Sequence, residues 1–225
     1  MNVQSKIIII LKFALVNAIG LTNPNNISYN VEYTFHEVNT MSKKNDIFDA
    51  TLALIIEDGM QSVTLSKILE RAGVGSGTLY NYFSSKDELL YELFRQIMQK
   101  MSDSIITGYN KNEDVRLRFN HLLNGYLDYV IQNYDENNFV SQYSHLLHKI
   151  KPEDCYTNEF TIALGETFKA GKEQKIILDM EVPMLIQIVT GILISVVNGY
   201  KSNKYELDDR KKKNILNICW NSIRA

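Results

Sequence analysis

The sequence predicts an all-α protein with an N-terminal three-helix, helix-turn-helix unit and a larger helical C-terminal unit. Two observations lead to this prediction. Residues 63–87 follow the pattern of two short helices across a glycine turn and the start of a third helix. After residue 88, apolar residues recur at helical spacing, and the whole chain holds only three prolines. A chain of 225 residues that is 45% hydrophobic can bury the core that such a fold needs.

The first part of the helix-turn-helix pattern is marked by its capping residues. A helix over residues 43–58 has a wide apolar stripe, and Gly59 is expected to end it. Thr64 is a good N-cap for the next helix. Gly73 is expected to end that helix, because glycine adopts a positive φ without steric cost.

The second helix of the motif has an unusually polar outer face. Ser76 is expected to cap it, and only Leu79 and Phe83 are apolar enough to anchor it. Its other side chains present hydroxyl, amide and phenol groups: Thr78, Tyr80, Asn81 and Tyr82. Two short helices across a glycine turn, the second with a polar outer face, form the arrangement with which helix-turn-helix proteins read the major groove. DNA reading is therefore the leading hypothesis.

The segment GVGSGTLYNYFSSKDELL resembles the signature of the TetR family of bacterial repressors. This resemblance implies that bases and phosphates are contacted from Ser76, Gly77, Thr78, Tyr80, Asn81 and Tyr82, with a further phosphate contact at Lys86. Thr64 and Ser66 lie at a helix N-terminus, where free N–H groups and the helix dipole favour a phosphate. The chain lacks a Lys or Arg at Ser76 or Asn81, which leaves the base preference open. The alternative for Tyr80 and Tyr82 is a packing role.

The charge balance is low for a DNA-binding protein. The formal net charge is −2, and residues 41–100 contain seven basic and eight acidic side chains. Binding would have to rely on the local placement of Lys43, Lys44 and Lys86, on helix N-termini at phosphates, and on two copies acting together.

Helical patterns fill the rest of the chain. Ser85 and Glu88 form a potential capping box for a long helix that runs to about Thr107. Further helices are predicted over about 115–133, 139–150, 155–171, 183–200 and 208–225. An aromatic effector pocket between these helices is predicted from His121, Tyr126, Tyr129, Tyr143, Phe160, Phe168 and Met184. The alternative is that these aromatic residues form ordinary core.

No cofactor or metal site is predicted. His145 and His148 share a helix face, but the sequence offers no convincing third ligand. Cys155 and Cys219 lack metal or redox spacing and read as reduced thiols. No nucleophile–base arrangement, carboxylate pair or phosphate-binding loop stands out, so the sequence does not indicate an enzyme.

The stretch 182–197 is apolar nearly all round, which predicts a helix buried both in its own fold and against a partner. Its length and the polar residues Gln187, Thr190 and Ser195 argue against a membrane span. Gly191 and Ser195 offer a flat strip for close approach of another helix, and Trp220 adds a second apolar face. A homodimer through these helices is expected, and closure of a monomeric core is the alternative.

Residues 1–40 do not fit the rest of the chain. An apolar run over 7–21 is too short for a membrane span, and 27–35 alternates like a strand that has no partner. The leading interpretation is upstream sequence translated from a mis-assigned start, with Met41 as the native start, and a disordered extension is its rival. The expected domains are therefore a DNA-binding head at 41–88 and an effector-binding and dimerisation body at 89–225.

Together these features predict a cytoplasmic, ligand-responsive repressor that binds a palindromic double-stranded DNA operator as a homodimer. By resemblance, an unknown small-molecule effector would shift the helix that begins near Ser85, and the two recognition helices would then no longer match the half-sites. The alternative function is a helical protein-interaction or sensor module in which the helix-turn-helix is structural.

Overall fold

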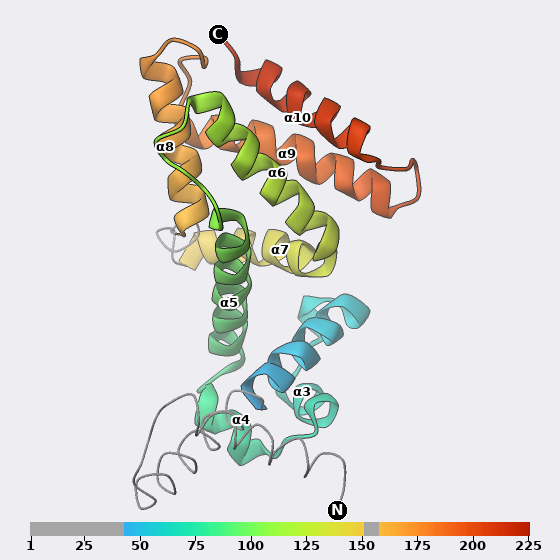
Figure 1. Ribbon diagram of the computed structural model, residues 1–225. Coiled ribbons are helices and arrows are strands. Elements are labelled where there is room, and N and C mark those ends of the chain that lie inside the picture. The colour runs from blue at the N-terminus through green and yellow to red at the C-terminus, as the bar shows by residue number, and fades with distance from the viewer. Residues whose placement is uncertain (1–42, 151–157) are drawn as a thin grey trace, which may run out of the picture. The chain divides into compact units, whose positions relative to one another are not determined.

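The computed structural model describes residues 43–150 and 158–225, without the side chains of residues 145 and 148–150. Within these residues the regular structure is helical, as the sequence predicts (Figure 1). The expectations for residues 1–40, for the His145–His148 pair and for Cys155 lie outside the described part. The chain divides after Lys86 into two compact units.

The first unit contains the helix-turn-helix. A helix over residues 43–58 is followed by the short 3₁₀ helix η1 (Met60–Ser62), by α3 (Leu65–Ala72) and by α4 (Ser76–Tyr82). Its core is apolar and fully enclosed, with exposed fractions of 0–2% for Ile47, Phe48, Val63, Ile68, Leu79 and Phe83. The predicted anchors of the second helix, Leu79 and Phe83, therefore lie in this core.

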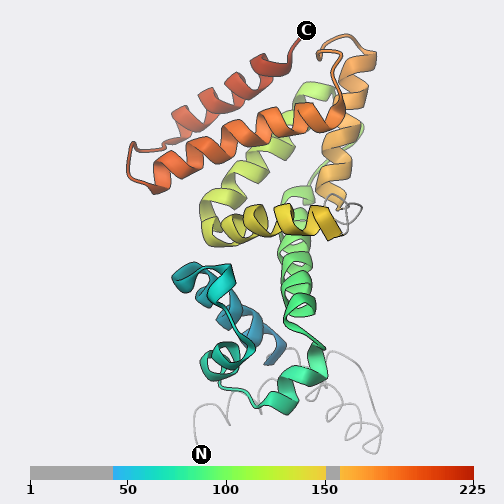
Figure 2. The same ribbon diagram turned by 180° about the vertical axis from the view of Figure 1, so that it is seen from behind.

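The second unit consists of longer helices. Their bounds are α5 (Lys86–Ile106), α6 (Val115–Gln132), α7 (Tyr134–Ile150), α8 (Glu159–Glu173), α9 (Val182–Lys201) and α10 (Asp209–Ile223). α6 packs against α8 and α9, and α9 also packs against α8 and α10. Figure 2 shows α9 and α10 side by side over their length. Fully buried Phe119, Leu122, Leu164, Phe168 and Val189 are part of the shared core.

Two predicted helix starts are wrong. α7 begins at Tyr134 rather than at 139, with Asp135 and Glu136 in its first turn, where negative charge is favoured by the helix dipole. α8 begins at Glu159 rather than at 155. Its N-cap is Asn158, whose side chain accepts the Thr161 N–H at 2.8 Å while the Thr161 hydroxyl oxygen accepts the Asn158 N–H at 3.3 Å.

The length argument against a membrane span of α9 is also wrong. α9 has 20 residues, and it is the one described helix that is long and apolar enough to cross a membrane. One of its faces is nevertheless built into the core, because Leu185, Val189, Leu193 and Val197 recur every four residues and are fully buried. A core helix satisfies the same length and composition test, so this helix is weak evidence for a membrane.

Candidate nucleic-acid interface and ligand groove

The turn between α3 and α4 is fixed by local hydrogen bonds. The Thr64 side chain accepts the Lys67 N–H at 3.4 Å, as expected for an N-cap. Gly73 has φ 64°, and the N–H of Val74 donates to Leu69 O at 3.2 Å. This is the closing pattern of a helix that ends at a left-handed glycine.

The expected cap of α4 is not the residue that the sequence suggested. Gly75 is the N-cap, Ser76 is the first helical residue, and no side chain caps this end. Within the described part of the chain, no side chain therefore satisfies the first N–H groups of α4, which an outside acceptor could bind. Leu79, with no exposed surface, and Phe83 tie the helix to the core of its unit.

The residues predicted to contact DNA lie largely at the surface. Thr64, Ser66, Ser76, Gly77, Tyr80 and Asn81 are exposed, while Thr78 and Tyr82 are half-buried. Tyr80 is 57% exposed, which speaks against the packing role that was its alternative. Tyr82 lies against Phe83, with ring centroids 6.1 Å apart.

Most cations among the described residues of this unit are engaged within it. Lys67 pairs with Asp58 at 2.7 Å, and Arg71 makes a two-point contact with Glu57 that raises the pKa of Arg71 through hydrogen bonding and charge attraction. The Lys44 ammonium lies 5.4 Å from the centroid of the Phe48 ring. These contacts explain how the first helix and α3 are joined, and they leave few free positive charges.

Lys86 has a partner that the sequence did not suggest. Its half-buried ammonium donates to the carbonyl oxygens of Met60, at 3.4 Å, and of Val63. These carbonyls flank the segment that leads into α3, so Lys86 holds the start of the helix-turn-helix. A phosphate contact from Lys86, as the resemblance implies, stays a prediction.

The predicted effector residues are spread through the second unit. Tyr126 stacks on Phe160 with centroids 5.4 Å apart, and Tyr143 lies 5.6 Å from Phe94. Phe168 and Tyr129 are buried, and the Tyr129 hydroxyl donates to Glu136 at 2.6 Å. Met184 is 48% exposed. The contacts of the aromatic residues in this set are those of core side chains, and effector binding by the set stays a prediction.

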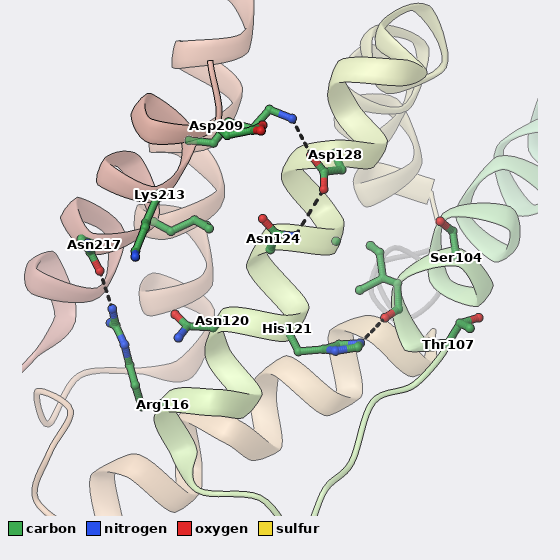
Figure 3. A pocket seen from close by; sticks show the side chains of 14 residues that line it. Ser104, Thr107, Arg116, Asn120, His121, Asn124, Asp128, Asp209, Lys213 and Asn217 are labelled. Atoms are coloured by element: carbon green, nitrogen blue, oxygen red, sulfur yellow. Dashed lines mark hydrogen bonds and ion pairs between the residues drawn. The ribbon is translucent and has the colours of Figure 1, made fainter. Parts of the chain in front are cut away.

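His121 lines a groove that the sequence analysis missed. This groove has a volume of about 710 Å³ and lies between the end of α5, α6 and α10 (Figure 3). α6 contributes Arg116, Asn120, Asn124 and Asp128, which recur every four residues and so share one helix face. That polar stripe on a mainly apolar helix is the signal from which the groove could have been found.

The predicted dimer residues differ in exposure. Gly191 and Ser195 are exposed on α9, and a Cβ atom added at Gly191 would meet nothing within 4 Å. Trp220 is half-buried and packs within its own chain, with its ring edge-on to Phe119 at 5.1 Å. Contact of these residues with a second copy stays a prediction.

Two family models match this chain, and together they cover residues 47–225. Residues 47–93 match the family described as bacterial regulatory proteins of the tetR family, and residues 94–225 match the tetracyclin repressor-like C-terminal domain. Because the second match covers more than half of the chain, the protein belongs to the TetR family. The family consists of regulatory proteins, in agreement with the expectation that this chain is not an enzyme.

Individual relatives are similar over about a third of the chain. The HTH-type transcriptional regulator BetI 2 of Chromohalobacter salexigens is 35% identical over 72 residues, which are 32% of this chain and 35% of that protein. The fatty acid metabolism regulator protein of Bacillus subtilis is 37% identical over 67 residues, 28% of this chain and 34% of that protein. The matches thus span about a third of the length of these curated relatives.

Solved structures show the same fold over most of their length. A TetR family transcription regulator from Marinobacter aquaeolei superposes with a TM-score of 0.72 at 17% identity, over 84% of this chain and 98% of that chain. The regulator FadR from Bacillus subtilis in complex with stearoyl-CoA superposes with a TM-score of 0.56 at 17% identity, over 77% of this chain and 96% of that chain.

Proposed function

We propose that this protein is a DNA-binding transcriptional regulator that reads its operator with α4. The observation that supports this most is the presentation of α4 itself. Ser76, Tyr80 and Asn81 are exposed, and no side chain of the described residues caps its N-terminal N–H groups. A left-handed glycine and a buried Leu79 fix its position within its unit. Such a helix has the features that a major-groove reader needs.

The residues of α4 suggest how bases would be recognised. An Asn side chain can donate to and accept from adenine, and a Thr methyl group can contact the methyl group of thymine. Asn81 and Thr78 are the candidates for these two roles. Exposed Tyr80 and the N-terminal N–H groups of α3 and α4 would position the helix on phosphates.

The regulator is proposed to act as a homodimer and as a repressor in the cytoplasm. A palindromic operator presents two half-sites about 34 Å apart, and two copies of α4 are needed to occupy both. Residues 41–88 would form the reading head and residues 89–225 the effector and dimerisation body. Because α5 begins at Lys86, within the last residues of the head, and continues into the body, a change in the body that moves α5 would alter operator affinity.

A binding titration tests this proposal. The full chain is titrated against DNA from just upstream of its own gene, with Thr78→Ala, Tyr80→Ala and the control Ile56→Ala in parallel. Ile56 is 50% exposed in the same unit but lies outside the predicted set. Specific binding that weakens about tenfold or more in the first two variants, roughly 1.4 kcal/mol each, and is unchanged in the control supports α4 as the reader.

One observation favours the alternative of a protein-interaction or sensor module. Lys67, Arg71 and Lys86 are engaged in internal contacts, so the head offers few free cations to phosphates. Salt dependence separates the two functions, because phosphate contacts release counterions and protein contacts generally do not. If the affinity of this chain for its binding partner is the same at low and at high salt, the protein-interaction module is favoured.

A further inference from the structure

The groove between α5, α6 and α10 holds two cations that have no carboxylate partner. Among the described residues, Arg116 of α6 and Lys213 of α10 make no ion pair. Asn120 lies four residues after Arg116 and Asn217 four residues after Lys213, so each cation has an amide on the same helix face. The two faces line one groove (Figure 3).

Arg116 is held in place by neutral groups. Its Nη2 donates to Asn217 Oδ1 at 2.6 Å, and its guanidinium lies 4.5 Å from the centroid of the Trp220 ring. Its Nη1 is buried and has no hydrogen-bond partner in the described structure, and burial lowers the pKa of this side chain. A partly desolvated cation without a counterion costs free energy, and a bound anion would recover part of that cost.

The acidic residues of the groove do not supply that counterion. Asp128 is already engaged on both oxygens, by the Lys212 ammonium at 2.9 Å and by the Asn124 amide at 3.2 Å. Asp209 is exposed in the first turn of α10, where the helix dipole favours its charge. The uncompensated positive charge therefore belongs to Arg116 and Lys213.

We propose that this groove binds a small ligand that carries a carboxylate or phosphate group. Lys213 and Arg116 would attract the anionic group, and Asn120 and Asn217 would hydrogen-bond the polar atoms next to it. The groove volume of about 710 Å³ lies within the range of small-molecule sites, roughly 300–1,000 Å³. The site is distinct from the aromatic set predicted from the sequence, with which it shares only His121.

The far wall of the groove belongs to the last turn of α5. His121 Nε2 lies 2.9 Å from the Ile105 carbonyl oxygen, and the His121 ring lies 5.8 Å from the Tyr109 ring. A ligand in the groove would therefore touch the end of the helix that starts directly after the helix-turn-helix. The idea that this ligand is an effector rests on the proposed DNA-binding function. Binding of the ligand in the groove does not depend on that function.

Calorimetric titration of the DNA-free full chain with citrate and with inorganic phosphate, at constant ionic strength, tests the site. We expect binding of at least one of the two probes in the millimolar range or tighter. Lys213→Gln should weaken that binding at least tenfold, and Asn120→Leu should do so without any change in charge. Arg210→Gln on the same helix removes a cation outside the groove and should leave binding unchanged.

Two results would overturn the site. One is that neither probe binds the wild-type chain. The other is that Arg210→Gln weakens binding as much as Lys213→Gln, because that would indicate general charge attraction. The same variants are then tested for DNA binding with and without the probe. A probe that binds in the groove without changing DNA affinity supports the site and removes the effector role. Failure of DNA binding itself contradicts the proposed function while leaving the titration intact.

Discussion

Lys86 has a contact inside the recognition unit in addition to the DNA contact that the family resemblance implies. Its ammonium lies on the carbonyl oxygens of Met60 and Val63, and the side chain is half-buried. The family resemblance assigns the same residue to a phosphate. Loss of the carbonyl contacts would change the stability of the protein, whereas loss of a phosphate contact would change the salt dependence of DNA binding.

Lys86→Met is expected to lower the stability of the full chain, because the carbonyl groups of Met60 and Val63 lose a charged donor in a partly buried place. The loss should be about 1–3 kcal/mol, measured by urea unfolding. If Lys86 acts only by holding the helix-turn-helix in place, its loss lowers DNA affinity but leaves the slope of log affinity against log salt concentration unchanged. Unchanged stability together with a salt slope smaller by about one would assign Lys86 to a phosphate instead.

Individual residues were predictable where their partners are close in sequence. Thr64, Gly73, Leu79 and Phe83 have the roles that the pattern indicated, because capping and helix spacing are local properties. The Arg116–Asn217 hydrogen bond joins residues 101 positions apart, so no sequence window contains both. The contacts of Lys86 with the carbonyl oxygens of Met60 and Val63, 26 and 23 positions away, were not predictable for the same reason.

At the scale of elements, helix existence was predictable and helix starts were less so. α8 was placed too early because its capping box uses Thr161 where the usual pattern has Glu or Gln. The groove was missed because α6 was interpreted by its apolar residues alone. The polar stripe from Arg116 to Asp128 becomes meaningful only when α10 lies opposite.

The end of α8 provides a sharp test of packing. A Cβ atom at Gly171 would lie 2.8 Å from Ile177 Cγ1 and 3.1 Å from Val115 Cγ1. The backbone of Ile177 cannot easily move, because it forms an antiparallel bridge with the backbone of Arg224. The N–H of the next residue, Leu178, also donates to the carbonyl oxygen of Ile223 at 2.8 Å.

Gly171→Ala is therefore expected to destabilise the protein by about 1–3 kcal/mol, although alanine alone would favour the helix. Gly165→Ala in the same helix is the control, because the nearest atom to its added Cβ, Val182 Cγ1, is at an ordinary 3.7 Å. Urea unfolding of both variants measures the difference. A Gly171→Ala variant as stable as Gly165→Ala would contradict the packing described for this corner.

For the whole molecule, the exposed face of α9 bears on the proposed dimer. Gly191 has open space around it in the single chain, so an arginine there should not disturb the fold. Gly191→Arg is expected to shift the protein from dimer to monomer in light-scattering measurements at equal concentration. Gln174→Arg adds the same charge at the end of α8 and should leave the dimer intact. Equal dimer fractions in both variants would place the interface elsewhere.

The central claim is that α4 reads DNA as one of two copies, and selection from a random DNA pool by the full chain tests it most directly. We predict enrichment of an inverted repeat whose half-sites lie about one helical turn apart, and loss of that enrichment in Thr78→Ala. Selection that enriches no sequence at low salt, or that enriches the same repeat with Thr78→Ala and Tyr80→Ala, would contradict the claim.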